Sequence, residues 1–198
     1  HNYLNKMVET GKSSNDDSTT TVTIITSILF TVILYTYEQT LHPSVPGGDA
    51  GELITEAWQF GLPHPPGYPT FSMLGHMFSR KLDLQPATYV RNNGSASVPI
   101  SIIAWRLNFM SALLTSFSAV FLFLMIQNVR FVIIKDNATK EKSEKVPTSI
   151  LSFSDFHAEE QHLFPWLLGS TIASITFAFS PLIWTYAVTA EVFALNNF

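Results

Sequence analysis

Three acidic side chains stand within eight residues of one another, at spacings that could place them on one side of a helix. Asp49, Glu52 and Glu56 follow two glycines in the stretch Pro46-Gly-Gly-Asp-Ala-Gly-Glu-Leu-Ile-Thr-Glu. Residues three and four apart are neighbours on a helix surface. A carboxylate held in a fixed direction can act as a general base that takes the proton of a hydroxyl. Asp49 and Glu52 are therefore candidate catalytic residues.

The same acids also fit a structural role. Asp49 could cap a helix over 50–60, with Glu52 at its third position, in an arrangement that resembles a capping box. Gly61 and Pro63 would end this helix. Its apolar stripe predicts an amphipathic helix on the membrane surface, with its carboxylates turned toward water or a substrate cleft. The stripe consists of Leu53, Ala57 and Phe60, widened by Ile54 and Trp58. Capping and catalysis remain compatible.

A proline-rich stretch, His64-Pro-Pro-Gly-Tyr-Pro, follows the acids. Proline fixes its own φ and pushes the preceding residue to extended geometry, which we expect for His64 and Tyr68. One interpretation is a rigid turn that leads into Thr70–Ser79, and local physics alone favours it. The other is that the rigid backbone positions His64 and Tyr68 against a ligand.

Arg106 and Glu191 adjoin hydrophobic segments. Arg106 could be an interfacial arginine that extends its head group to water. This is the commoner role of such an arginine. The alternative is that it clamps a lipid phosphate, because guanidinium matches phosphate oxygens in a bidentate way. Glu191 is a candidate site residue because it lies beside a span, or an interfacial helix cap.

The elements that must position these residues are membrane spans. Apolar residues make up 46% of the chain and charged residues only 13%, against about 25% charged in soluble domains. A spanning helix needs about 20 predominantly apolar residues. Three segments qualify, at 18–37, 107–129 and 163–187, and Pro181 is expected to kink or end the third. Residues 1–17 are polar, which predicts a disordered tail.

The basic residues of the loops predict orientation, because Lys and Arg favour the cytosolic side. The tail and the loop 130–162 together hold Lys6, Lys12, Arg130, Lys135, Lys140, Lys142 and Lys145. The longer loop 38–106 holds only Arg80, Lys81, Arg91 and Arg106. We therefore expect 38–106 and 188–198 in a lumen, where all the candidate site residues would share one membrane face. Of two glycosylation sequons, Asn93 should then carry a glycan and Asn137 should not.

Other features limit the alternatives. The absence of cysteine excludes disulfides and Cys-based metal sites from this chain. The net charge of −4 gives no reason to expect nucleic acid as a partner. Because the chain begins at His1 and ends at Phe198 directly after a hydrophobic segment, we expect it to be a piece of a longer protein.

Four motifs, in this order, resemble one family. They are Pro46-Gly-Gly-Asp-Ala-Gly-Glu-Leu-Ile-Thr, His64-Pro-Pro-Gly-Tyr-Pro-Thr-Phe, Arg106-Leu-Asn-Phe-Met-Ser-Ala and Tyr186-Ala-Val-Thr-Ala-Glu-Val-Phe-Ala-Leu-Asn. Over residues 40–198 the chain is similar to the transmembrane-protein-260-like protein O-mannosyltransferases. The resemblance implies an all-α, multi-pass glycosyltransferase of the GT-C type in the endoplasmic reticulum membrane.

The resemblance also implies a reaction. Such enzymes use a dolichyl-phosphate sugar as donor, with no other cofactor, and eukaryotic members are linked to mannosylation of Ser/Thr in the IPT domains of plexin-like receptors. The first luminal loop of GT-C enzymes carries the acidic base, which matches Asp49, with Glu52 second. His64 and Tyr68 would bind sugar or acceptor, Arg106 the departing phosphate, and Glu191 would orient the site. No metal is required by this scheme, and we expect the isolated piece to be inactive.

Two other classes of protein remain as alternatives. A membrane transporter would use intramembrane carboxylates to move an ion or solute, and it predicts charges at mid-depth in the spans, which these segments lack. A non-catalytic membrane protein would have no reason to gather acids and prolines on one loop.

Overall fold

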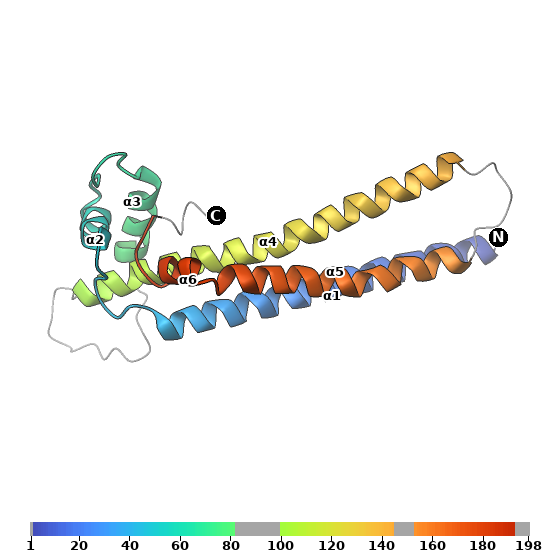
Figure 1. Cartoon of the computed structure of the whole chain (residues 1–198), viewed down its shortest axis with the longest axis horizontal. Helices are drawn as coiled ribbons and strands as arrows, with labels where there is room; N and C mark the ends of the chain where they lie inside the picture. The colour runs from blue at the N-terminus through green and yellow to red at the C-terminus, as the bar shows by residue number, and fades with distance from the viewer. Residues whose placement is uncertain (1, 82–99, 145–152, 193–198) are drawn as a thin grey trace. The chain divides into compact units, whose positions relative to one another are not determined.

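The computed structural model describes residues 2–81, 100–144 and 153–192, and these residues form helices joined by turns and bends, with no strand among them. The helices are α1 (Asn2–Thr40), α2 (Ala50–Gln59), α3 (Pro69–His76), α4 (Ile100–Glu144), α5 (Phe153–Ala178) and α6 (Pro181–Ala187) (Figure 1). A π-helical turn over Met77–Lys81 continues α3. The all-α class predicted from the sequence is confirmed for the described residues.

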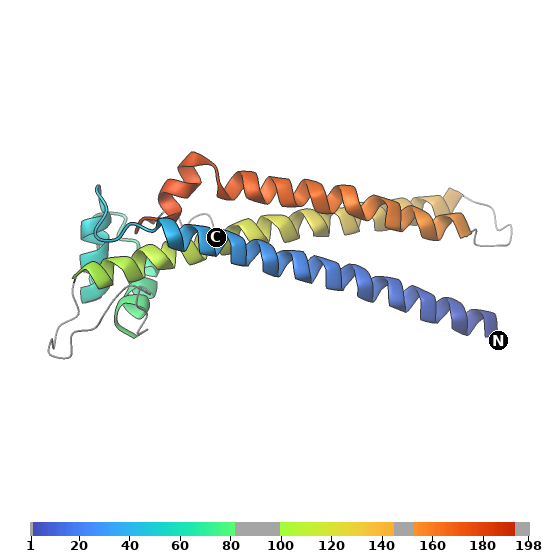
Figure 2. The ribbon, with the colours of Figure 1, turned by 90° about the horizontal axis from the view of Figure 1, so that it is seen from below.

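Two of these helices are long and apolar enough to cross a membrane, over Ser18–Thr40 in α1 and over Ile100–Ile133 in α4. A third crossing is possible if Leu163–Ala178 and Pro181–Ala187 form one span, which is bent by 64° at its break. Figure 2 shows the sharp turn between α5 and α6. The predicted segments 18–37, 107–129 and 163–187 lie within these helices.

The second candidate span begins at Ile100, before the predicted segment 107–129, and therefore includes Arg106. Its side chain is only 3% exposed, and Nη1 donates a hydrogen bond of 2.7 Å to the carbonyl of Ser79. An arginine covered by protein does not need to end a hydrophobic helix, so α4 extends back through the apolar residues to Ile100.

The first helix also differs from expectation, since α1 begins at Asn2 where a disordered tail was expected over residues 1–17. No proline interrupts these residues. Once the apolar segment has formed a helix, the helix can therefore extend toward the N-terminus, because each added residue gains one backbone hydrogen bond.

The break between α5 and α6 leaves a carbonyl that a buried tyrosine satisfies. Pro181 has no N–H for the carbonyl of Phe177, which accepts from Ser180 instead. The bend also takes the carbonyl of Ala178 away from the N–H of Leu182, its partner in a continuous helix. The Tyr37 hydroxyl, from α1, donates a hydrogen bond of 2.6 Å to the carbonyl of Ala178. Tyr37 is fully buried, and its ring lies edge-on to Trp184 with centroids 6.0 Å apart. In a membrane, where water is absent, such a carbonyl needs a partner from the protein.

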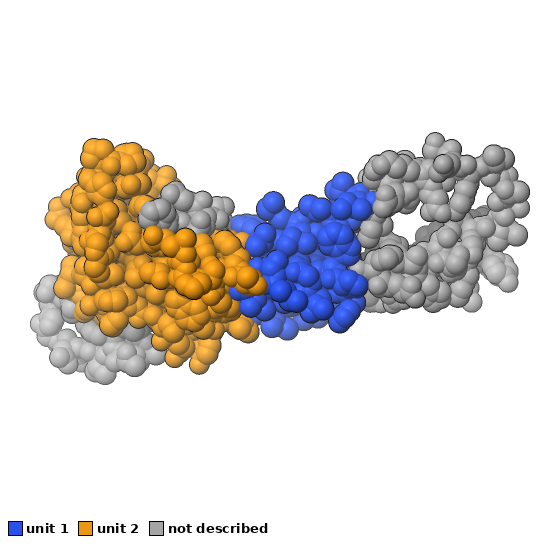
Figure 3. All heavy atoms as spheres, viewed as in Figure 1, with its two compact units in different colours: residues 1–31, 120–175 blue, residues 32–119, 176–198 orange. Residues whose placement is uncertain are grey.

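The contacts divide the chain into two compact units, shown in two colours in Figure 3. One unit contains residues 1–31 and 120–175, and the other contains residues 32–119 and 176–198. Within the first unit, Gln127 of α4 donates hydrogen bonds to the Ser170 hydroxyl at 2.6 Å and to the Trp166 carbonyl at 3.2 Å, both in α5. Side-chain hydrogen bonds of this kind join helices in membranes.

The second unit contains the core that carries the candidate site. Its buried apolar side chains come from α2, α3, the start of α4 and the segment after α6: Ala50, Leu53, Ile54, Ala57, Phe71, Ile103, Ala104, Leu107, Met110, Ala190 and Val192. The apolar stripe predicted for α2 therefore packs into this core, where protein covers Leu53, Ile54 and Ala57. Only Phe60, at the end of the stripe, remains 60% exposed. The expected position of α2 at a membrane surface stays a prediction.

A close approach of α2 and α3 depends on one glycine. A Cβ placed on Gly75 would lie 2.8 Å from the Cβ of Ala57 and 3.4 Å from Cδ2 of Leu107. Real Cβ atoms do not come as close as the first distance, so α3 packs at this depth because residue 75 has no side chain.

A carboxylate–histidine cluster as the candidate active site

Helix α2 presents Asp49 at its first turn, on a sharp backbone bend. Gly48 has φ of +68°, in the left-handed region that favours glycine. Asp49 is the residue before the helix and already has helical dihedrals, φ −79° and ψ −6°, and its side chain makes no capping hydrogen bond. The predicted capping box is therefore wrong. The Asp49 carboxylate is instead open to solvent, with 67% of its side chain exposed.

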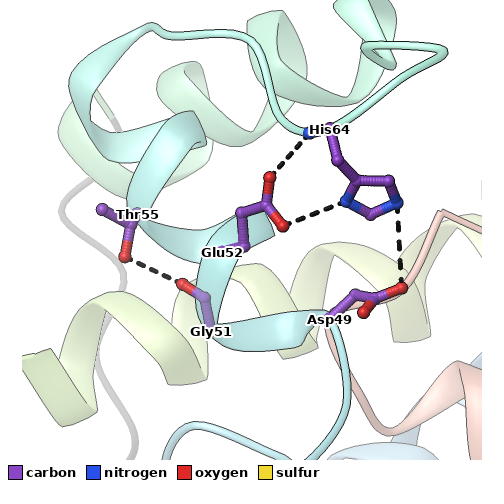
Figure 4. Close-up of polar contacts among 5 residues, drawn as sticks. All are labelled: Asp49, Gly51, Glu52, Thr55 and His64. Carbon is purple, nitrogen blue, oxygen red and sulfur yellow. Dashed lines mark hydrogen bonds and ion pairs between the residues drawn. The ribbon is translucent and has the colours of Figure 1, made fainter.

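Glu52 binds His64 rather than the start of its own helix. Its Oε1 accepts the backbone N–H of His64 at 2.6 Å, and its Oε2 lies 3.0 Å from Nδ1 of the same residue (Figure 4). This carboxylate therefore fixes both the backbone and the ring of the proline-rich stretch.

The contact changes the acidity of both groups. The hydrogen bond to the His64 side chain, followed by the bond to its backbone, holds the pKa of Glu52 below 4.5. The hydrogen bond from Glu52 in turn raises the pKa of His64 above 6.5, with smaller contributions from the charges of Glu52 and Asp49. The contact thus favours the protonated form of His64 more than in an ordinary histidine.

The other edge of the His64 ring faces Asp49. Nε2 lies 3.9 Å from Oδ2 of Asp49, so the imidazole stands between two carboxylates (Figure 4). Asp49 and Glu52, from the acidic stretch, and His64, from the proline-rich stretch, therefore form one cluster. We call these three residues the acid–histidine cluster.

Tyr68 lies beside this cluster, although its backbone differs from expectation. Its ring stands edge-on to His64 with centroids 5.8 Å apart. The extended geometry predicted for Tyr68 is wrong, because φ of 40° and ψ of 54° are left-handed. Tyr68 starts α3, where its carbonyl accepts the N–H of Ser72. A non-glycine residue in this region costs on the order of 1 kcal/mol and is often found at functional sites.

Glu191 reaches the same bend from the segment after α6. Its Oε1 lies 3.8 Å from the position that a Cβ on Gly48 would occupy. Burial raises the pKa of the Glu191 carboxyl above 4.5, and the negative charge of Asp49 raises it further. The structure therefore brings Glu191 toward Asp49. It places Arg106 against Ser79 instead, so the predicted contact of Arg106 with a phosphate stays a prediction.

Asn108 holds this arrangement together and was not singled out from the sequence. It is fully buried in α4, and its Nδ2 donates to the carbonyls of His42 at 2.7 Å and Ser44 at 3.2 Å. The backbone N–H of His42 donates to the carbonyl of Val188 at 3.1 Å. Asn108 thus holds the segment that leads to Asp49, and the backbone of His42 joins that segment to the one that leads to Glu191. The available signal was an amide in an apolar span, which is costly unless it is bonded.

Two further expectations are untested. Asn93, the predicted glycosylation site, lies outside the described residues. Among the residues that the structure describes, no group of three His, Asp or Glu side chains is arranged to hold a metal ion. This arrangement does not test the reaction itself, so a mechanism without metal stays a prediction.

Comparison with known proteins identifies the family of this chain. Residues 49–198 match the profile of a family described as the Protein O-mannosyl-transferase TMEM260 N-terminal domain. The chain belongs to this family. The family match begins at Asp49 and contains every candidate residue of the cluster.

Two curated relatives carry the same family name. The chain is 32% identical over 170 residues to the protein O-mannosyl-transferase tmem260 of Dictyostelium discoideum, a match that covers 86% of this chain and 15% of the relative. It is 28% identical over 169 residues to the TMEM260 protein of Mus musculus, covering 85% of this chain and 17% of the relative. The chain thus spans about a sixth of the length of these relatives. No solved structure matches.

Proposed function

We propose that this chain supplies the acid–histidine cluster of a membrane-bound protein O-mannosyltransferase, with Asp49 as the base that activates the acceptor hydroxyl. The observation that carries the proposal is the position of Asp49. Asp49 directly precedes α2, and its side chain makes no capping hydrogen bond. Its carboxylate is open to solvent and faces His64. A base must be reachable by its substrate, and this carboxylate meets that condition.

The proposed reaction has one step. Asp49 accepts the proton of an acceptor Ser or Thr hydroxyl while the oxygen of that hydroxyl attacks the anomeric carbon of the mannose. The bond from this carbon to the phosphate oxygen breaks, and its electron pair leaves with dolichyl phosphate. The configuration at the anomeric carbon is inverted. The dolichyl-phosphate donor and the Ser/Thr acceptor on secretory-pathway proteins such as plexin-like receptors come from the family resemblance.

Glu52 and His64 support this step in different ways. Glu52 holds His64 at two points and favours its protonated form. A positive charge beside the reacting centre can stabilise the phosphate that departs. Since Arg106 is buried against Ser79, His64 is the described cation that we assign first to this role. Tyr68, whose ring contacts His64, and Glu191, which lies beside Gly48, are assigned to binding of sugar or acceptor.

The location follows from the same proposal. The described residues contain two helices that can cross a membrane, and a third if the bent pair is one span. A dolichyl-linked donor is found in the endoplasmic reticulum, so we assign the chain to that membrane, with the acid–histidine cluster in the lumen.

The test is an assay of mannose transfer in the full-length protein that carries this chain. Labelled dolichyl-phosphate-mannose is incubated with acceptor domains and with the Asp49→Asn variant. Loss of a general base lowers the rate by about 10² to 10⁴-fold, and we expect a loss in that range. Glu56→Gln is the matched control, because Glu56 is on the same helix outside the cluster. A correctly folded Asp49→Asn protein with full activity would disprove the assignment.

A further inference from the structure

An exposed surface on the outside of α3 combines apolar side chains with a cation. Met73, His76, Met77 and Arg80 follow one another at spacings of three, one and three residues, which places them on one side of α3 and its π-helical extension. Phe60 joins them, because its ring lies 4.9 Å from that of His76. We call these five residues the α3 face. Phe60, Met73 and Met77 are 60%, 61% and 41% exposed.

A cation–aromatic pair closes one end of this face. The guanidinium of Arg80 lies 4.4 Å from the centre of the Trp58 ring. Pairs of this kind keep a long cationic side chain beside apolar surface while its charge stays accessible to water or phosphate. Trp and Arg together are typical of the zone where a membrane meets water.

Phe60 has a backbone conformation that is unusual for a residue with a large side chain. Phe60 follows the last turn of α2 with φ of +60° and ψ of 37°. Glycine or asparagine usually occupies this left-handed position, because a Cβ is strained there. Phe60 holds this conformation with its ring largely exposed and outside the buried core. Phe60 therefore extends the exposed apolar surface of Met73 and Met77, and contiguous apolar surface of this kind marks an interaction site.

The position of α3 beside the α4 span indicates what covers the α3 face. The core of this unit includes Ile103, Leu107 and Met110, all within the span Ile100–Ile133. In Figures 1 and 2, α2 and α3 both lie crosswise to α4, and α3 lies further along α4 than α2 does. An element packed beside the end of a span, on the side toward its middle, meets the boundary between lipid head groups and acyl chains.

We infer that the α3 face is seated in the phospholipid bilayer at the N-terminal end of the α4 span. Phe60, Met73 and Met77 contact the upper acyl chains, and Arg80 lies among the phosphates. The face therefore fixes the height of α3, and of the loop with His64 that precedes it, above the membrane. This inference does not depend on the mannose-transfer reaction.

The absence of cysteine from the chain allows a direct measurement of depth. Single-cysteine variants Met73→Cys and Met77→Cys are labelled with a nitroxide and reconstituted in phosphatidylcholine vesicles that contain no dolichyl lipid. The matched control is Thr55→Cys, which is exposed on α2 outside the α3 face. Collision rates are measured with oxygen, which concentrates in the bilayer, and with a water-soluble nickel chelate. Circular dichroism checks that each variant keeps the helix content of the unsubstituted chain.

We expect both labels on the α3 face to collide severalfold more with oxygen than with the nickel chelate, and the label at residue 55 to show the reverse. Two results would overturn the inference. Labels at 73 and 77 that prefer the chelate, as residue 55 does, would show that the face is in water. Labels shielded from both reagents would show that protein covers it.

Discussion

Glu52 and His64 touch at two points, where one carboxylate oxygen accepts the backbone N–H and the other lies 3.0 Å from Nδ1. Twelve residues separate them in the sequence, and the proline-rich stretch between Gly61 and Pro69 returns the chain to the first turn of α2. This contact turns two independent candidates into parts of one cluster, and it makes the charge of His64 depend on Glu52.

The pKa of Glu52 is lowered and that of His64 is raised, so their contact depends on pH in two directions. Glu52 has a lowered pKa in the folded protein, so its contribution to stability is present above about 4.5 and is lost as pH falls through the lowered value. His64 has a raised pKa, so its contribution is full below about 6.5 and is lost as pH rises through the raised value. The contact should be strongest between these limits.

Glu52→Gln should lower the pKa of His64, because the hydrogen bond to the Glu52 carboxylate is the largest cause of the raised pKa. The measurement is an NMR titration of the His64 ring in detergent micelles, with the signal assigned by loss in His64→Gln. The ring signals of His42 and His76, which lie outside this contact, serve as internal references. A His64 titration that is unchanged by Glu52→Gln would show that the contact does not persist in solution.

Asn108→Ala should loosen the segment that leads to Asp49. The substitution removes the donors to the carbonyls of His42 and Ser44, and each lost hydrogen bond costs about 0.5–1.5 kcal/mol. Hydrogen exchange of residues 43–48 should become faster. In the full-length protein we expect kcat for mannose transfer to fall more than KM rises, because Asp49 loses its fixed position.

Ser111→Ala is the control, since it changes another fully buried polar residue one turn further along α4. Equal effects of both substitutions on exchange and kcat would mean that Asn108 acts only through general helix packing.

Gly75→Ala should destabilise the unit that contains α2 and α3. The added Cβ would lie 2.8 Å from the Cβ of Ala57, and overpacking of this kind costs about 1–3 kcal/mol. The better helix propensity of alanine, about 1 kcal/mol, offsets part of that cost. Thermal unfolding in detergent should show a lower Tm.

Gly51→Ala provides the comparison within the same unit. There the Cβ would meet Val45 at an ordinary 3.6 Å, so the propensity gain should leave Tm unchanged or higher. A Tm that rises equally for both variants would contradict the close contact of α2 and α3.

Tyr37→Phe should destabilise the break between α5 and α6, because the Ala178 carbonyl loses its hydroxyl partner. A buried polar group left without a partner costs about 1–3 kcal/mol. Tyr35→Phe is the control, since Tyr35 is 63% exposed on the same helix. Reversible unfolding in bicelles should separate the two variants, and indistinguishable free energies of unfolding would refute the role of Tyr37.

The sequence predicted the elements better than their contacts. The limits of α2 were expected at 50–60 and lie at Ala50–Gln59, because glycines and prolines on both sides act locally. The break at Pro181 was foreseen for the same reason. Local signals of this type depend on backbone geometry, which a single residue can determine.

The candidate site was less predictable, because its contacts join distant segments. The capping box failed since Glu52 had a stronger partner in His64. Arg106 does not extend its head group to water, since its side chain is buried and donates a hydrogen bond to Ser79 on another element. Asn108 was missed because its partners are backbone carbonyls of a loop, and no spacing in the sequence marks them.

The contact between Tyr37 and Ala178 also has a consequence for how this sequence can vary among related proteins. In a relative whose helix continues unbroken through this segment, the carbonyl of residue 178 would accept the N–H of residue 182. Its residue at position 37 would then be free of the requirement for a phenol. A tyrosine at position 37 should therefore accompany the break after residue 178 across an alignment, although the two lie far apart in the sequence.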